Sequence, residues 1–363
     1  MRLRGITGLA CAFALCLTIP YTMPAKAAEE GAADASSVLP VTGGAVVPVE
    51  ISFADGVVKP LTITGAVLDG ESVRLSEEDS ITLSLEAVPG EYVLEIDYDP
   101  LPQNSQDVEL LLQFDGKVPF RAAEAIRLRR RWRDKADSPR QDSRGNDIRL
   151  PQEEIPFEER GWLTATATDS TGYENGALRF VLRETQSLTI QAVQGAVRIR
   201  TIRFKSAEQP LTYAQYMAAH AGAVDAAISA APLEAELTAW KNDPTLFAVA
   251  DRTTPATSPS KGAKISLNTI GGEKWATAGS TLAWDVQVEE SGLYEIRLRC
   301  RQNYSQGFYS TRSLQIDGKT PFAEAENLRF LYKRGWQMIA LSDGAGIPYK
   351  FYFEAGRTYT LSL

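Results

Sequence analysis

An all-β protein of two tandem β-sandwich domains is the fold class that this 363-residue sequence predicts. Short segments with apolar residues at every second position follow one another from about residue 46 to the C-terminus. Helical spacing of apolar residues is confined to one alanine-rich stretch. Two parts of the chain also repeat each other at an offset of 202 residues, which indicates that a whole domain is duplicated.

The repeat consists of matching turns and strand starts. A last match falls at a shorter offset because the first copy carries extra residues after Trp132. The matched segments, first copy and then second, are Gly90-Glu91-Tyr92 and Gly292-Leu293-Tyr294, Asp115 to Phe120 and Asp317 to Phe322, Glu124 and Glu326, Arg127 and Arg329, and Gly161-Trp162 and Gly335-Trp336.

Segments with alternating apolar residues, bounded by turn dipeptides, predict antiparallel strands with one buried face. Many such strands without intervening helices are typical of a β-sandwich or jelly roll. The predicted strands are 58–64, 80–86, 92–98, 108–114, 178–182, 187–190 and 197–204 in the first copy, and 282–288, 294–300, 312–316 and 349–353 in the second.

The strands and the helical stretch define the predicted domain boundaries. We expect a first sandwich domain at 45–206, a helical linker at 207–232 and a second sandwich domain at 233–363. The first copy continues through a final strand to Phe204, whereas the second copy has no counterpart of that strand. We therefore expect this chain to be part of a longer protein.

The N-terminus has the pattern of an export signal. Arg2 and Arg4 precede an apolar run, and Ala25-Lys26-Ala27 fits a cleavage site, so residues 1–27 are predicted to be removed after Ala27. Residues 28–44 are predicted to be a disordered leader. The protein is then secreted or associated with the cell surface, and no transmembrane segment follows.

Charge and residue content exclude several classes of function. The net charge is −8, and cleavage removes the positive charges of Arg2, Arg4 and Lys26, leaving −11. Such an acidic chain is not expected to bind nucleic acid. Past the signal only Cys300 and His220 remain, which excludes an intrachain disulfide and argues against nucleophilic triads and zinc sites.

Catalysis would then need carboxylates, and no pair stands out. Glu153, Glu154, Glu158 and Glu159 lie in a polar segment beside the arginine-rich run 127–133, without a pattern that indicates burial. Because these glutamates are expected to balance the positive charge of the arginine-rich run, the run is not expected to bind phosphate. We therefore predict a protein that is not an enzyme.

The repeated Asp-Gly-Lys-x-Pro-Phe element is interpreted mainly as structural, with a ligand loop as the alternative. Asp-Gly suits a tight turn with positive φ, proline stiffens the exit, and phenylalanine can enter the core. The turn shows duplication and does not by itself indicate an activity.

Aromatic residues outside the repeat are the stronger candidates for ligand binding. Trp284 alternates with apolar strand residues and is predicted to lie in the core. Trp132, Trp275 and Tyr304 have polar neighbours in the sequence and are predicted to be exposed, where an aromatic face could stack on a sugar ring. Arg301 and Asn303, beside Tyr304, could bind hydroxyl groups.

Several motifs, in order over about residues 75–363, resemble one family. They resemble the amino-terminal region of large extracellular solute-binding proteins of sugar ABC importers in Gram-positive bacteria, in which two β-sandwich domains precede a two-lobed transport domain. That transport domain is absent here, so the resemblance implies an ABC permease as a partner only through a missing C-terminal domain. The motifs are Tyr213 to Met217, Asp142 to Gln152, Asp243 to Phe247, Ile265 to Gly272, Ser305 to Phe322 and Gly335 to Met338.

The second domain also begins like a carbohydrate-binding module of the galactose-binding-like jelly-roll type. Leu233-Glu234-Ala235-Glu236 resembles the first strand of those modules, where matching glutamates help to hold a structural calcium ion. The resemblance implies Glu234 and Glu236 as calcium ligands, and carboxylate oxygens suit that cation. The alternative is two exposed strand glutamates.

The function expected from these features is recognition of extracellular carbohydrate by an accessory region of an importer's binding protein. Two alternatives stay open: a carbohydrate-binding appendage of a secreted glycosidase, and a structural spacer or protein-interaction module at the cell surface. The predicted ligand-binding residues are Trp132, Trp275, Arg301, Asn303 and Tyr304, and the predicted metal ligands are Glu234 and Glu236.

Overall fold

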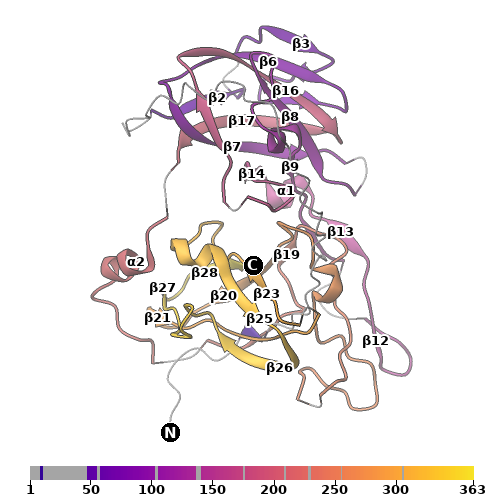
Figure 1. Ribbon diagram of the computed structural model, residues 1–363. Coiled ribbons are helices and arrows are strands. Elements are labelled where there is room, and N and C mark those ends of the chain that lie inside the picture. The colour runs from indigo at the N-terminus through magenta and orange to yellow at the C-terminus, as the bar shows by residue number, and fades with distance from the viewer. Residues whose placement is uncertain are drawn as a thin grey trace, which may run out of the picture. The chain divides into compact units, whose positions relative to one another are not determined.

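The computed structural model confirms an all-β chain and divides it into two compact units (Figure 1). The described residues are 9–10, 47–54, 58–102, 105–135, 140–174, 176–207, 210–227, 230–254, 256–304 and 306–363. The N-terminal unit comprises Thr18–Leu128 and Trp162–Ala207. The C-terminal unit comprises Met1–Leu17, Arg129–Gly161 and Glu208–Leu363. Apart from residues 9–10, the predicted signal and leader lie outside the described residues.

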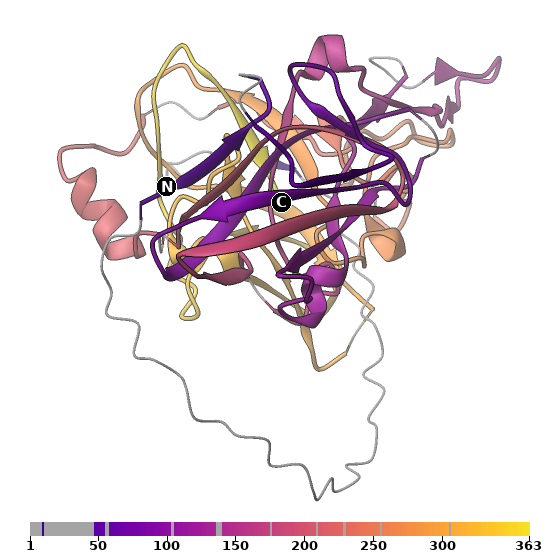
Figure 2. The same cartoon turned by 90° about the horizontal axis from the view of Figure 1, so that it is seen from above.

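The N-terminal unit is a sandwich of two antiparallel sheets, which Figure 1 shows as stacked layers and Figure 2 shows from above. One sheet has the order β14-β7-β17-β5-β4, with β15 also paired to β7 and β2 to β17. Its strands are β2 (Val49–Ser52), β4 (Val67–Leu68), β5 (Val73–Leu75), β7 (Gly90–Pro100), β14 (Leu163–Thr166), β15 (Arg179–Leu182) and β17 (Val197–Ser206). The other has the order β3-β6-β16-β8-β9, formed by β3 (Thr62–Thr64), β6 (Ser80–Glu86), β8 (Val108–Phe114), β9 (Ile126–Leu128) and β16 (Thr185–Gln194).

Alternating residues of both sheets fill the core of this unit, as the period of two predicts. On β6, Ile81, Leu83 and Leu85 are buried while the residues between them are more exposed. Phe114 of one sheet lies 6.1 Å, centroid to centroid, from Phe204 of the other. The two faces therefore pack directly on each other.

The repeated Asp-Gly turn has the same backbone in both units. Asp115 and Gly116 have φ of 48° and 71°, and Asp317 and Gly318 have φ of 51° and 75°. Each aspartate also accepts a backbone hydrogen bond from the neighbouring strand, from Ser187 N at 2.8 Å and from Thr360 N at 2.9 Å. These contacts support the structural interpretation of the turn.

The C-terminal unit repeats the arrangement with shorter strands. Its largest sheet has the order β13-β10-β19-β20-β28-β24, and a second has the order β18-β1-β22-β26. Three two-stranded sheets complete it: β11-β12, β21-β27 and β23-β25. The strands are β1 (Leu9–Ala10), β10 (Trp132–Asp134), β11 (Arg140–Gln141), β12 (Asp147–Ile148), β13 (Gln152–Glu154), β18 (Leu233–Glu234), β19 (Trp240–Lys241), β20 (Leu282–Gln287), β21 (Gly292–Tyr294), β22 (Arg297–Gln302), β23 (Tyr309–Arg312), β24 (Gln315–Ile316), β25 (Leu328–Leu331), β26 (Lys333–Ala340), β27 (Phe351–Phe353) and β28 (Thr358–Ser362).

The extra residues of the first copy, Arg129–Gly161, pack with the C-terminal unit, although they lie in sequence within the predicted first domain, 45–206. Trp132 of β10 pairs with Lys241 of β19, which makes β10 a strand of the large sheet. The buried Lys241 ammonium lies 3.0 Å from Asp134. Asp147 accepts a hydrogen bond from Leu267 N at 3.1 Å. These contacts attach the inserted residues to the C-terminal unit.

The predicted helical linker contains α2 (Tyr213–Ala219), which begins with a capping box formed by Thr212 and Gln215. The helix is shorter than the pattern predicted, since residues 224–227 are not helical. Its tyrosines attach it to the C-terminal unit: the Tyr213 and Tyr216 hydroxyls accept hydrogen bonds from Lys350 N at 3.0 Å and Tyr352 N at 2.8 Å.

The remaining helices are single turns: α1 (Phe157–Arg160), η1 (Arg121–Glu124), η2 (Gly272–Lys274) and η3 (Ala323–Asn327). Within the part of the chain that the structure describes, no helix has the length and apolar character needed to cross a bilayer.

Candidate functional site

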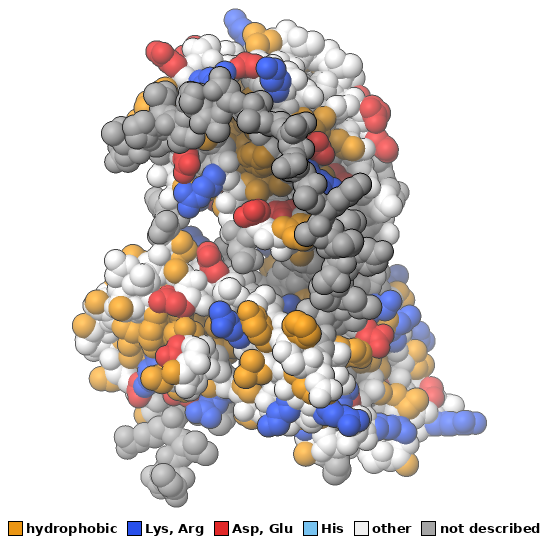
Figure 3. Space-filling model, in the orientation of Figure 1, with side chains coloured by type: hydrophobic (Ala, Val, Ile, Leu, Met, Phe, Trp, Pro, Cys, Tyr) orange, Lys and Arg blue, Asp and Glu red, His pale blue; other side chains and the backbone are white. Residues whose placement is uncertain are grey.

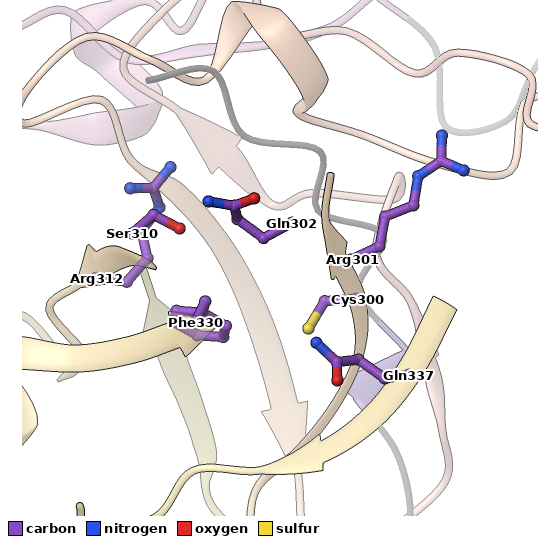
Figure 4. A pocket seen from close by; sticks show the side chains of 7 residues that line it. All are labelled: Cys300, Arg301, Gln302, Ser310, Arg312, Phe330 and Gln337. Atoms are coloured by element: carbon purple, nitrogen blue, oxygen red, sulfur yellow. The ribbon is translucent and has the colours of Figure 1, made fainter. Parts of the chain in front are cut away.

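A small pocket of the C-terminal unit is lined by residues of β22, β23, β25 and β26 (Figure 4). Its empty volume is about 260 Å³, which includes open solvent, and its interior has space for about one water-sized group. We call it the end pocket, and it is lined by Cys300, Arg301, Gln302, Ser310, Arg312, Phe330 and Gln337.

Strand alternation directs these side chains to the pocket. On β22, Leu298, Cys300 and Gln302 are the buried positions, so Gln302 continues a row of core residues. Two cross-strand pairs supply other lining residues, Ser310 with Phe330 and Cys300 with Gln337. The pocket is therefore built on regular strands.

The N-terminal unit has apolar residues at the matching positions. At the offset of 202 residues, Ser310 corresponds to Val108 and Arg312 to Leu110, and both of these residues are 0% exposed. Gln302 corresponds to the buried Pro100. Gln337 corresponds to Leu163, because Gln337 pairs with Cys300 in the same way that Leu163 pairs with Tyr98 in the N-terminal unit. One copy thus fills this space with hydrocarbon, whereas the other places polar groups in it.

Gln302 is the least satisfied of these polar groups. It is 2% exposed, and neither its Nε2 nor its Oε1 has a hydrogen-bond partner among the described residues. An unpaired buried polar group costs about 1–3 kcal/mol of stability. Such exceptions to hydrogen-bond pairing call for an explanation such as an ordered water molecule or a ligand.

Arg312 adds an unbalanced positive charge to the end pocket. Its Nη1 and Nη2 donate to the carbonyls of Thr311 at 2.8 Å and Trp275 at 2.9 Å, and its Nε is buried without a partner. The guanidinium lies 4.3 Å from the Trp275 ring centroid. Burial lowers the pKa of Arg312 to about 10. No ion pair between the described residues brings a carboxylate to it.

Three predicted ligand-binding residues lie at or next to this pocket. Arg301 contributes to its lining, but its side chain extends away from Gln302 and Arg312 in Figure 4 and forms an ion pair with Asp251 at 2.8 Å. Asn303 follows the strand, and its buried Oδ1 has no partner among the described residues. Tyr304 is 42% exposed. Ligand binding by these residues stays a prediction.

The two predicted tryptophans are buried, so the expectation that they are exposed is wrong. Trp275 is 1% exposed and donates from Nε1 to Ser280 O at 2.8 Å. Trp132 is 8% exposed and lies in β10, which β19 and β13 flank. Their polar neighbours in the sequence misled the prediction because tertiary contacts cover both rings. Neither offers an open face for a sugar.

The predicted calcium ligands lie at and just after β18. Glu234 accepts a hydrogen bond from Ser258 Oγ at 2.6 Å, and Glu236 is 3% exposed, so the pair is not two exposed strand glutamates. Burial first, and then the charges of Glu234 and Asp147, raise the pKa of Glu236 to about 8. A bound cation would favour the ionised form of Glu236 and so lower its pKa. The described residues, however, form no cluster of three or more metal-binding side chains. For a calcium ion, the predicted site therefore offers two carboxyl groups, those of Glu234 and Glu236.

Gln302, Ser310, Arg312 and Gln337 were missed because their strand pattern resembles that of core residues. A usable signal was present in the repeat, since comparing the copies position by position exposes the exchange of apolar residues for polar ones.

Exposed apolar residues lie on the strands beside the pocket. Tyr309 and Leu331 are cross-strand partners and are 45% and 67% exposed. Met338 on β26 is 52% exposed. Figure 3 shows hydrophobic side chains on the surface where β25 and β26 lie in Figure 1. Adjacent residues of a strand face opposite sides of the sheet, so these exposed residues point away from the pocket that Ser310, Phe330 and Gln337 line.

Comparison with known proteins gives no family assignment. No family model and no curated protein matches the chain. Among solved structures, the tandem CBM22-1-CBM22-2 domains of Paenibacillus barcinonensis Xyn10C match with a TM-score of 0.22 and 9% identity, over 89% of this chain and 85% of that one. The Podospora anserina GH26-CBM35 β-(1,4)-mannanase matches with a TM-score of 0.24 and 14% identity, over 45% of this chain and 28% of that one.

A GH115 4-O-methyl-α-glucuronidase also matches, with a TM-score of 0.25 and 12% identity, over 51% of this chain and 20% of that one. This chain thus spans under a third of both enzymes. Likenesses at these scores carry no argument about function, and the all-β assignment stands on the strand arrangement itself.

Proposed function

We propose that the protein is an exported, non-catalytic carbohydrate-recognition module, with the end pocket of its C-terminal unit as the binding site. The observation that carries the proposal is the buried Gln302 amide, whose donor and acceptor atoms have no partner among the described residues. Sugar hydroxyl groups both donate and accept hydrogen bonds, so they match an amide, a hydroxyl and a guanidinium set on strands.

The pocket itself holds only a small group, so most of a sugar would lie outside it. Tyr304 is exposed close in sequence to Gln302. Its ring could stack on the C–H face of a sugar whose polar substituent enters the pocket. Tyr304 directly precedes the segment Ser305 to Phe322, which resembles the importer proteins.

The wider role that we propose is that of an accessory region of a sugar importer's binding protein, secreted after cleavage at Ala27. The motifs that resemble the importer proteins occur in the same order along this chain, and they support this role. A permease would contact the transport domain of such a protein, so we assign no permease contact to the two units described here. Calcium held by Glu234 and Glu236 remains part of the proposal, as a structural ion.

A glycan array followed by isothermal titration calorimetry tests the binding site. Gln302→Leu and Tyr304→Ala should each weaken binding of any glycan found, by about fivefold or more, since a lost polar contact or stacking ring is worth about 1–3 kcal/mol. Tyr173→Ala is the matched control, because Tyr173 is 90% exposed in the N-terminal unit and should not matter. Absence of glycan binding, with variants that change stability alone, would favour the spacer alternative.

A further inference from the structure

The Arg312 side chain is partly exposed, but its Nε is buried, and none of its contacts among the described residues is with an anion. Two of its N–H groups reach backbone carbonyls, one face covers Trp275, and Nε has no partner. Burial alone shifts its pKa downward, with no acidic neighbour acting on it. Buried charges in proteins are normally paired, because an unpaired one costs several kcal/mol.

Two fully buried cations of the same unit show the usual pairing. Arg130 and Lys241 both have side chains that are 0% exposed, and they pair with Glu154 at 2.9 Å and Asp134 at 3.0 Å. The unit therefore provides carboxylates for these two fully buried cations. Arg312 differs from them, and it also differs from Leu110, the apolar residue at its place in the N-terminal unit.

Hydrogen-bond donors lie with Arg312 in the end pocket. The polar ends of Gln302, Ser310 and Arg312 lie in the same part of the view in Figure 4. Gln302 can donate from Nε2, Ser310 from its hydroxyl, and Arg312 from Nε. A guanidinium with neighbouring neutral donors is a recognition arrangement for a carboxylate. The interior has space for about one water-sized group, which corresponds to one carboxylate oxygen, and it does not admit a sugar ring.

We propose that the end pocket binds a carboxylate group, with Arg312 as its cationic partner and Gln302 and Ser310 as further donors. The carboxylate can come from an acidic sugar within a glycan or from a small free acid. We favour the acidic sugar, and this choice rests on the proposed function. The ring would then lie outside the pocket.

Calorimetry and thermal unfolding of the mature protein with four probes test the proposal: sodium glucuronate, glucose, sodium acetate and sodium chloride at matched ionic strength. Glucuronate should bind at least tenfold tighter than glucose, and acetate should raise the unfolding temperature more than chloride does. Arg312→Leu, which installs the residue of the N-terminal unit, should abolish the preference for glucuronate. Arg334→Ala, at an exposed position of β26, is the matched control and should keep it.

A second variant keeps the test decisive if Arg312→Leu does not fold. Gln302→Glu places a carboxylate beside Arg312 permanently, so it should raise the unfolding temperature and abolish glucuronate binding. Equal binding of glucuronate and glucose, equal effects of acetate and chloride, or lower stability of Gln302→Glu at neutral pH would each overturn the proposal.

The outcomes also separate this proposal from the proposed function. Glycan binding that depends on Gln302 but shows no preference for acidic sugars overturns the carboxylate site and leaves carbohydrate recognition standing. Binding of acetate and glucuronate that depends on Arg312, without binding of any oligosaccharide, supports the carboxylate site. It would also show that the bound carboxylate does not come from a glycan.

Discussion

Glu236 is a buried side chain and Arg312 a partly exposed one with a buried Nε, and the described residues bring no opposite charge to either. In both cases burial is the leading cause of a pKa shift toward the neutral form. They differ in their surroundings, since acidic neighbours act on Glu236, whereas neutral donors lie with Arg312. This difference is why we propose a cation as the partner of Glu236 and an anion as the partner of Arg312.

The raised pKa of Glu236 predicts how stability depends on pH. The folded protein keeps the Glu236 proton up to about pH 8, whereas the unfolded chain loses it near the ordinary value of 4.5. The free energy of unfolding should therefore fall as pH rises from about 4.5 to about 8, by at most about 1.4 kcal/mol per pH unit. Urea unfolding at several pH values, without calcium, should show this fall in the wild type but not in Glu236→Gln.

Glu273→Gln serves as the control, because Glu273 is exposed and its replacement should leave the wild-type pH dependence in place. Saturating calcium should remove the fall in the wild type if the ion binds the ionised Glu236. Identical pH slopes for the wild type and Glu236→Gln would show that this carboxyl is not held neutral in the folded protein.

At the scale of elements, β10 and β19 bring a charged pair into the C-terminal unit. Antiparallel pairing of Trp132 with Lys241 places the Lys241 side chain, 0% exposed, 3.0 Å from Asp134. Burial lowers the pKa of Lys241, and the Asp134 charge opposes this shift. The pairing of an inserted strand thus also brings the partner that a buried ammonium requires.

Asp134→Ala should destabilise the C-terminal unit by about 3 kcal/mol, because it leaves the Lys241 ammonium buried and unpaired. Urea unfolding followed by tryptophan fluorescence measures the loss. Asp225→Ala is the comparison, since Asp225 is 56% exposed in its pair with Lys350 and should cost less than about 1 kcal/mol. Similar small losses of unfolding free energy in both variants would mean that the Lys241 ammonium finds another partner or loses its proton at little cost in free energy.

At the scale of the whole molecule, each unit contains residues from separate parts of the chain. Arg129–Gly161 interrupts the N-terminal unit in sequence and contributes β10 and β13 to the large sheet of the C-terminal unit. Besides strand pairing, Arg131 lies 4.3 Å from the Trp240 ring centroid and Arg149 lies 3.9 Å from that of Phe247. Stability of the inserted residues should therefore follow that of the C-terminal unit.

Native-state hydrogen exchange can test this dependence with Trp284→Ala, which removes a side chain from the core of the C-terminal unit. Such core truncations cost about 3–5 kcal/mol. The amides of β10 and β20 should lose protection together, while those of β8 in the N-terminal unit stay protected. Protection of β10 that follows β8 instead would show that the insertion unfolds with the N-terminal unit.

Much of the fold followed from local patterns in the sequence. Alternation at Ile81, Leu83 and Leu85 predicted a buried strand face, and the Asp-Gly turns at 115 and 317 revealed the duplication, because both depend on residues close together in the chain. Of the predicted site residues, Arg301, Asn303 and Tyr304 lie at or next to the end pocket, and ligand binding by them stays a prediction. The sequence pattern did not indicate Gln302 or Arg312, whose importance comes from burial.

The sequence by itself therefore determined the all-β class and the duplicated sandwich. Only the tertiary structure decided that Trp132 and Trp275 are covered, that Arg129–Gly161 packs with the C-terminal unit, and that Arg312 meets no carboxylate among the described residues. The physical reason is that burial and charge pairing depend on residues brought together from distant parts of the chain, whereas strand alternation and turn geometry depend on neighbours in sequence.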